Sequence, residues 1–245
     1  GGDSAGDDTD GDSGPPDTEG HTGDTGRPPA ERIRVPAPSP DLRFVGRWGY
    51  DVYERPWAGW PGASVTVRFD GVGVDAVFET GAREDWIRVV IDGDVAGAQK
   101  IALPVGESTV TLAEDLAPGE HTIEVVKESA GTNPLTFGGL EITGWQLLEP
   151  PGDPERRMVF YGDSNLAGYS LMSERNEGAE ELAGAFFTYA GITSRAFGAE
   201  HHNISLSGAT LGSMAGLYDQ LAETGSAAYD FDDFPADVVV MNLGA

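Results

Sequence analysis

Three kinds of residue pattern are missing or scarce in this sequence. Cysteine is absent, which excludes a disulfide framework and a thiolate metal site. No apolar run reaches the ~18 residues that a membrane-spanning helix needs, so no membrane span is expected. Basic residues number 15 against 41 acidic ones, and the formal net charge is −26. Nucleic acids and anionic membrane surfaces would be repelled, which favours a neutral or weakly charged partner.

Residues 1–32 lack the side chains that a folded segment needs. Up to residue 30 there is no aromatic or branched aliphatic side chain, so the segment is predicted to be a flexible tether. Its piece "DDTDGDSG" resembles a calcium loop only faintly, because the closing Glu and the flanking helices are absent. The chain begins with Gly rather than Met, and this composition is typical of the spacer of a bacterial lipoprotein. We therefore expect a secreted or cell-surface protein, and no metal.

Residues 35–148 are predicted to form an all-β domain. Short runs with a period of two are typical of strands, and they occupy residues 63–69, 73–79, 85–93, 108–112, 121–128 and 140–148. Turn-like pieces such as "FDGVG", "IDGD", "LAPGEH" and "FGG" lie between them. Many short strands without helices indicate a β-sandwich or jelly roll. Its Trp48, Trp57 and Trp60 would form either a sugar-stacking platform or ordinary packing, and packing is the more common role.

A linker at 149–156, rich in proline and charge, precedes a second domain at 157–245. Strands are predicted at 157–161, 202–207 and 236–244, and helices at 184–198 and 211–223. Strands that alternate with helices form a parallel sheet with helical cover. The second domain is therefore predicted to be α/β and, at this length, incomplete.

Polar turns follow all three predicted strands of the second domain. The first strand ends in Gly162, Asp163 and Ser164, the second in Ser207 and Gly208. Ligands bind beyond the carboxyl ends of such strands, so these turns would meet in one place if the first strand lies between the others. A lone Gly-Asp-Ser is usually a plain turn. Its position directly after a buried strand favours a nucleophile turn instead, with backbone N–H groups nearby for a developing oxyanion.

Here the sequence resembles a known family. "YGDSNLAGY", "SLSGATLG" and "DVVVMNLGA" resemble the first three blocks of the SGNH hydrolases, also called GDSL-type esterases. "LRFVGRWGY", "WPGASVTVRFDGVGVDAVF" and "IRVVIDGD" resemble the N-terminal jelly roll of carbohydrate esterase family 2. The resemblance covers residues 42–245. It implies a jelly roll followed by a flavodoxin-like SGNH domain, and an acetylxylan esterase-like activity without a cofactor.

The same resemblance assigns roles to particular residues. Ser164 would be the catalytic nucleophile, and the N–H groups of Ser164 and Gly208 would form the oxyanion hole. Gly162 and Asp163 would support the nucleophile turn, and Asn165 departs from the family pattern, in which an apolar residue is common. The third oxyanion donor, an Asn, would follow Ala245. The catalytic His would also lie beyond Ala245, so the chain as written is expected to be inactive.

The four histidines of the chain are not expected to replace that base. His201 and His202 are predicted to lie before the second strand, at the amino end of the sheet, while His121 belongs to the β domain and His21 to the tether. A serine without a base within hydrogen-bond reach is a poor nucleophile. The predicted function is a serine esterase that removes acetyl groups from polysaccharide through a seryl acyl-enzyme. The alternatives are a non-catalytic carbohydrate-binding surface protein with a remnant SGNH domain, and a surface interaction module on its tether.

Overall fold

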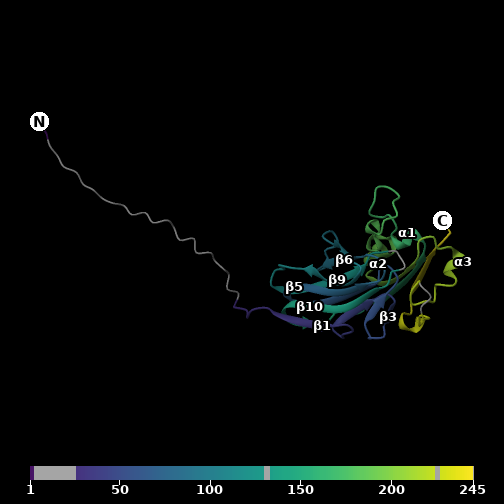
Figure 1. Ribbon diagram of the computed structural model, residues 1–245, viewed down its shortest axis with the longest axis horizontal. Coiled ribbons are helices and arrows are strands. Elements are labelled where there is room, and N and C mark those ends of the chain that lie inside the picture. Colours follow the sequence, from purple (N-terminus) through teal and green to yellow (C-terminus); the bar gives the residue numbers. More distant parts are fainter. Residues whose placement is uncertain (3–25, 130–132, 224–226, 245) are drawn as a thin grey trace.

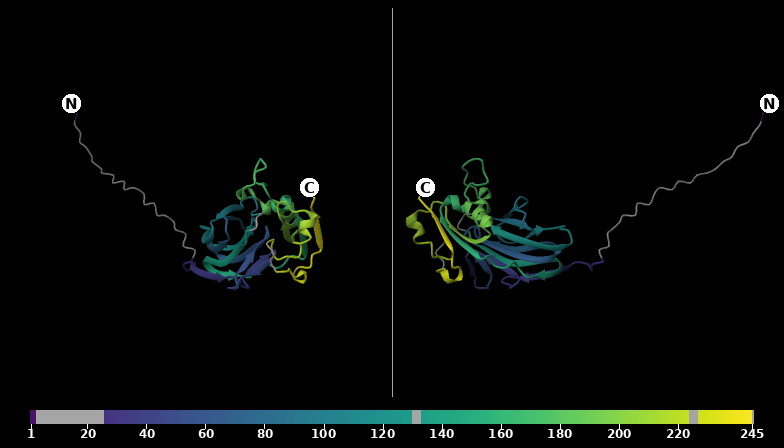
Figure 2. Two further views of the ribbon diagram at one scale, coloured as in Figure 1. Left: turned by 45° about the vertical axis from the view of Figure 1, so that its right-hand side comes forward. Right: turned by 180° about the vertical axis from the view of Figure 1, so that it is seen from behind.

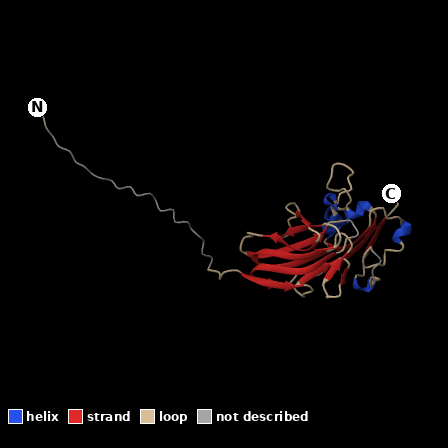
Figure 3. Ribbon diagram, in the orientation of Figure 1, coloured by secondary structure: helices blue, strands red, loops and turns tan. Residues whose placement is uncertain are grey.

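The computed structural model describes residues 1–2, 26–129, 133–223 and 227–244, and strands dominate it (Figures 1 and 3). Most of the predicted tether lies outside these ranges. The first sheet contains β1 Glu31–Pro36, β2 Leu42–Val45, β3 Trp48–Tyr50, β4 Pro56–Ala58, β5 Ser64–Thr80, β6 Asp85–Ile91, β7 Gln99–Leu103, β8 Gly106–Ala113, β9 Gly119–Lys127 and β10 Leu135–Leu148. The first domain is therefore rich in strands, as predicted.

Strand β5 is the centre of the first sheet. It pairs antiparallel with β2, β8, β9 and β10. Alternate residues along these strands point inward, and they enclose one core of Val, Ile, Leu and Phe side chains that includes Phe69, Phe78 and Phe137. In Figure 1 the long strands β5, β9 and β10 run side by side toward the second domain. The long strands thus connect the core of the first sheet with the region next to the second sheet.

Two predicted turns are wrong. "FDGVG" lies inside the continuous strand β5, and "FGG" lies inside β10. The glycines mark close approach of backbones rather than chain reversal, because a Cβ at Gly71 would lie 2.7 Å from the Thr143 carbonyl oxygen and one at Gly139 would lie 2.5 Å from that of Val35. Register shifts between β5 and β10 occur beside Gly139 and Gly144. Such glycines within strands are typical of β-bulges.

The last residues of the predicted tether contact the first domain. Residues 31 and 32 belong to β1, which pairs with β10. The Arg27 guanidinium lies 4.7 Å from the Trp145 ring centroid, and the Trp145 indole N–H donates to the Pro28 carbonyl at 2.7 Å. The folded part therefore begins before residue 32.

The second sheet consists of β11 Arg156–Gly162, β12 Ala199–Ser205 and β13 Val238–Asn242. Their order is β12-β11-β13, and both pairings are parallel. The expected central position of the first strand is thus present. The helices are α1 Ser164–Ala167, α2 Tyr189–Phe197 and α3 Leu211–Met214, with 3-10 turns η1 Glu180–Leu182, η2 Ala185–Phe187 and η3 Phe231–Asp233.

Both predicted helices are shorter than expected. The first begins at Tyr189 instead of residue 184, because Glu128 of the first domain accepts the Phe186 N–H at 2.8 Å and holds η2 apart from α2. The second ends at Met214 instead of residue 223. Beyond that point the Arg47 guanidinium donates hydrogen bonds to the carbonyls of Tyr218 and Gln220 at 2.8 and 2.6 Å. Tertiary contacts therefore outweigh local helix propensity in both places.

The first and second sheets lie next to each other (Figure 2), and the contact region around Trp60 and Arg47 is called the seam here. Trp60, which is 1% exposed, packs with Tyr161, Ile204 and Met214 of the second domain. Its indole N–H donates to the Gln220 carbonyl at 3.3 Å. Trp60 thus has the packing role that its sequence context favoured.

Candidate active site

The turn predicted to carry the nucleophile is built by Gly162 and Asp163. A Cβ at Gly162 would lie 2.6 Å from Leu166 Cβ, so only glycine fits where β11 meets α1. Asp163 is 7% exposed and is the N-cap of α1. Its Oδ1 accepts the Asn165 backbone N–H at 3.0 Å and the Asn165 side-chain amide at 3.3 Å. Asp163 therefore braces the turn, and Asn165 joins that brace from an exposed position.

Ser164 is the first residue of α1, directly beyond the carboxyl end of β11. Its side chain is half-buried. Its carbonyl accepts the Tyr169 N–H at 3.0 Å, which closes the short helix at Gly168. Within the described ranges the Ser164 hydroxyl has no hydrogen-bond partner. This hydroxyl is thus held on a fixed backbone and is free to meet a substrate.

Gly208 lies at the same edge of the second sheet. The register pairs Gly162 with Ser205, and the Leu206 N–H donates to the Gly162 carbonyl at 3.4 Å. Gly208 follows in a tight turn with a φ of +82°, which favours glycine. A Cβ there would meet nothing within 4 Å, so the turn is open to solvent. The two turns predicted to form the site therefore flank the ends of adjacent strands.

A buried polar chain, which sequence reasoning missed, ties α1 to β12. The Asn203 amide donates to the Leu166 carbonyl at 3.0 Å, and the Ser205 hydroxyl donates to the Asn203 side-chain oxygen at 2.5 Å. Asn203 and Ser205 are 3% and 1% exposed. The sequence contains no signal of this polar chain, because β12 reads "AEHHNIS" and most of its residues are polar. Their bonds fix the distance between the nucleophile helix and the strand that leads to Gly208.

The third predicted turn follows β13. Asn242 pairs with Gly162 in the register, so the residues after β13 emerge at the same edge. Gly244 has a φ of +99°, and Ala245 lies outside the described residues. All three strands thus direct their carboxyl ends toward one edge.

The second strand begins earlier than predicted, at Ala199 instead of residue 202, so His201 as well as His202 lies inside β12. Their register partners are Met158 and Val159, so at ~3.3 Å per residue His202 is roughly 10 Å along the strands from Gly162. Burial, and then the Arg195 charge, lowers the pKa of His201 to about 4. Burial, and then Arg47, lowers the pKa of His202 to about 3. Neither imidazole suits the role of a base for Ser164.

His121 lies in β9 of the first sheet, not at the edge that carries Ser164. In the first domain, Nδ1 of His121 lies 2.8 Å from an Asp92 carboxylate oxygen, and Nε2 lies 2.7 Å from the Ala117 carbonyl oxygen. Burial opposes protonation there, but these two partners raise the pKa of His121. His21 lies outside the described residues.

The described part of the chain lacks two kinds of feature. It contains no cluster of three or more His, Asp or Glu side chains with metal-ligating geometry. It also contains no helix long and apolar enough to cross a membrane.

Comparison with known proteins agrees with the sequence motifs. Residues 44–151 match the family described as carbohydrate esterase 2 N-terminal. The chain is 28% identical over 218 residues to the cellulase/esterase CelE of Acetivibrio thermocellus, which covers 84% of this chain and 26% of that protein. It is also 28% identical over 138 residues to an acetylxylan esterase / glucomannan deacetylase of Cellvibrio japonicus, with 56% and 38% covered. The chain thus spans between a quarter and two fifths of these relatives.

Solved structures with a similar fold include a carbohydrate esterase. A family two carbohydrate esterase from Cellvibrio japonicus superposes with a TM-score of 0.81 at 21% identity, covering 88% of this chain and 68% of that one. The resemblance to carbohydrate esterase family 2 is therefore confirmed in sequence and in structure.

Proposed function

We propose, on the basis of the resemblance to carbohydrate esterase family 2, that this protein is a serine esterase acting on acetylated polysaccharide. The observation that carries the proposal is the position of Ser164. It follows a buried parallel strand, its hydroxyl is unpartnered among the described residues, and an open glycine turn lies at the end of the neighbouring strand. A nucleophile beside free backbone donors is the arrangement that acyl transfer requires.

In this proposal the Ser164 hydroxyl attacks the acyl carbon of the ester. The carbonyl oxygen becomes an oxyanion, and the N–H groups of Ser164 and Gly208 donate to it. The sugar hydroxyl leaves with a proton, and water then hydrolyses the acyl-enzyme, so the serine is regenerated. A general base must hold the Ser164 proton between these steps. None of the histidines that the structure describes lies at this edge. We therefore propose none of them as the base. No metal or organic cofactor takes part.

The proposal also gives the finer architecture. Residues 35–148 form a jelly roll, 149–156 a linker and 157–245 part of an SGNH-type domain with a flavodoxin-like sheet. Gly162 and Asp163 act only through the turn that carries Ser164. The strand pairings of both sheets support this division.

The substrate we propose is an acetylated xylan, glucomannan or similar polysaccharide. One of the similar proteins is named for xylan and glucomannan deacetylation. A chain of net charge −26 is suited to such a neutral polymer. A polymer of this kind is outside the cell, so we propose that the protein is secreted or held at the cell surface.

The test is acetate release by the full-length natural protein from acetylated xylan and from acetylated glucomannan. Ser164→Ala should abolish release, because loss of the nucleophile typically costs on the order of a million-fold in turnover. Ser207→Ala is the matched control, since Ser207 is an exposed serine at the same edge, and it should retain most activity. Polysaccharide binding without acetate release by the unmodified protein would favour a carbohydrate-binding protein instead.

A further inference from the structure

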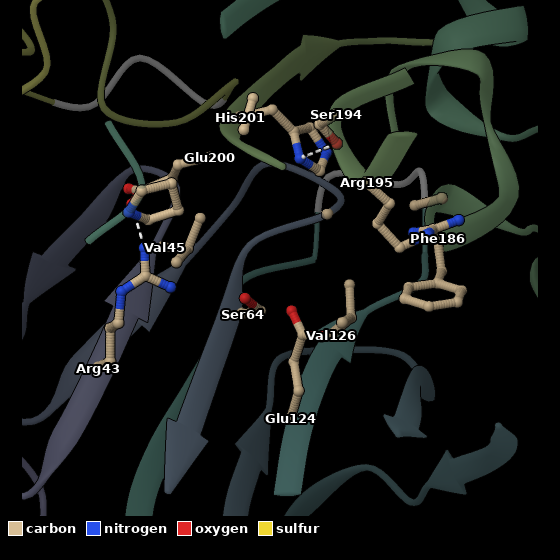
Figure 4. A pocket seen from close by; sticks show the side chains of 14 residues that line it. Arg43, Val45, Ser64, Glu124, Val126, Phe186, Ser194, Arg195, Glu200 and His201 are labelled. Carbon is tan, nitrogen blue, oxygen red and sulfur yellow. Dashed lines mark hydrogen bonds and ion pairs between the residues drawn. The ribbon is translucent and has the colours of Figure 1, made fainter. Parts of the chain in front are cut away.

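A second pocket, of about 110 Å³, lies in the seam between the domains. Figure 4 shows its side chains, which come from β2, β5 and β9 on one side and from η2, α2 and β12 on the other. Its β12 residues, Ala199 to His201, start that strand and pair with residues 156–158 of β11. Gly162 is five positions after Arg157 along β11, which corresponds to roughly 16 Å. The pocket is therefore distinct from the Ser164 edge.

A cation without a partner faces this pocket. The Arg195 guanidinium makes no hydrogen bond or ion pair with any described residue, and its Cζ lies 3.9 Å from the Phe186 ring centroid. The other guanidinium of the pocket, that of Arg43, is already paired with Glu200 and with Asp153. Arg195 is thus the guanidinium of this pocket with unused N–H donors, and the charges of Glu124 and Glu128 act on it only through space.

A carboxyl group lies beside the same space. In Figure 4 the Glu124 side chain points between Arg43 and Arg195, next to Ser64. Glu124 forms no ion pair with any described residue, and the Ser64 hydroxyl donates to it. The Glu124 carboxyl group therefore lies near Arg195 without forming an ion pair with it, and the pocket separates the two groups.

The rest of the wall is apolar. Val45, Val126 and Phe186 are 8%, 4% and 4% exposed, and all three line the pocket. A guanidinium next to methyl and aromatic groups matches a small molecule with an anionic head and a short apolar tail. The volume has room for only a few non-hydrogen atoms.

We propose that this pocket binds a short-chain monocarboxylate of the size of acetate. The carboxylate lies against Arg195 and accepts its N–H donors, and the methyl group packs on Val126 and Phe186. Under the proposed function acetate is the released product, and this pocket would be a second site for that product. The biological role as a product site rests on the proposed function, whereas the binding of acetate does not.

Glu124 competes with an anion for the positive charge of Arg195. Burial raises the pKa of Glu124, although Ser64, Arg195 and Arg43 act in the opposite direction. Arg43 is balanced by Glu200 and Asp153, and the charge of Glu128 also acts on Arg195. An ionised Glu124 should therefore weaken the binding of an anion at Arg195.

The experiment is calorimetric titration of the folded protein with sodium acetate at pH 6. A ligand of so few atoms has a limited affinity, and we expect a dissociation constant between about 0.1 and 10 mM. Arg195→Met should weaken acetate binding at least about tenfold, because a charge-assisted hydrogen bond is lost. Arg34→Met, at a side chain that is 88% exposed, is the matched control and should change nothing. Glu124→Gln should bind acetate at least as tightly as the unmodified protein, because the carboxyl group that competes for Arg195 is removed.

Three results would overturn the proposal: equal heats with acetamide or chloride, unchanged acetate binding in Arg195→Met, or no binding at ~100 mM acetate. Covalent labelling of Ser164 by a fluorophosphonate should be the same in Arg195→Met as in the unmodified full-length protein. Failure of acetate binding with intact labelling refutes the seam site only, whereas loss of labelling in the unmodified protein refutes the proposed function.

Discussion

Replacing Gly162 with alanine tests whether the strand-to-helix turn positions the nucleophile. The new Cβ would lie 2.6 Å from Leu166 Cβ and 2.8 Å from Leu166 Cδ2, whereas carbon atoms pack at ~3.5–4.0 Å. Leu166 is fully buried, with 0% exposed, and its Cβ cannot rotate away. The helix α1 must therefore move by about 1 Å, and Ser164 moves with it.

The expected cost has two parts. Overpacking of this kind costs about 1–3 kcal/mol in the free energy of unfolding, which lowers the melting temperature by roughly 2–12 °C in a protein of this size. A 1 Å misplacement of a reacting group costs about 100-fold in rate. The assay is the rate of fluorophosphonate labelling of the full-length protein, together with its thermal melt.

Gly212→Ala is the matched control for this change. Its Cβ would lie 3.8 Å from the nearest atom, Thr210 Oγ1, within the helix α3. It should label like the unmodified protein and be slightly more stable, since alanine favours helix. Labelling of Gly162→Ala within twofold of the unmodified rate would show that the turn does not fix Ser164.

Three further changes probe the site and its support. Gly208→Val should lower acetate release by roughly 100 to 1,000-fold, as expected for damage to one oxyanion donor, and unchanged kcat would remove Gly208 from that role. Arg47→Met removes one donor from the Tyr218 carbonyl and one from the Gln220 carbonyl, and should cost about 2–4 kcal/mol in urea denaturation; a loss no greater than that of Arg34→Met would refute this role of Arg47. His202 has a folded-state pKa of about 3, below its unfolded value, so the unfolded chain binds the proton first and stability falls as pH drops below ~6.5. His202→Gln should reduce that loss between pH 7 and pH 5 by roughly 2 kcal/mol, and an unchanged pH profile would contradict the assignment.

Local sequence was sufficient to predict the three parallel strands and the tight turn after the first of them. An apolar run that ends in Gly162 and Asp163 has few other structures available, whereas the strand order β12-β11-β13 was left open by the sequence. The errors came from glycines and from the seam. Gly71 and Gly139 look like turn residues in sequence, but each lies in a strand where a neighbouring backbone approaches within contact distance.

The seam contacts depend on residues far apart in the chain, which periodicity does not report. The helix predicted at 211–223 stops at Met214, where Arg47 of the other domain binds the following carbonyls. The Lys100 ammonium likewise donates to the Glu181 and Ala183 carbonyls at 2.7 and 2.6 Å. Arg47 and Lys100 read as ordinary surface residues in sequence, so neither contact was predictable.

The most direct test of the account is the site of covalent labelling. The full-length protein is treated with a fluorophosphonate, digested, and analysed by tandem mass spectrometry. The account predicts a single adduct on Ser164, within the peptide that contains "YGDSNLAGY", and none in Ser164→Ala. An adduct on another serine, or an unlabelled protein that still releases acetate, would contradict it.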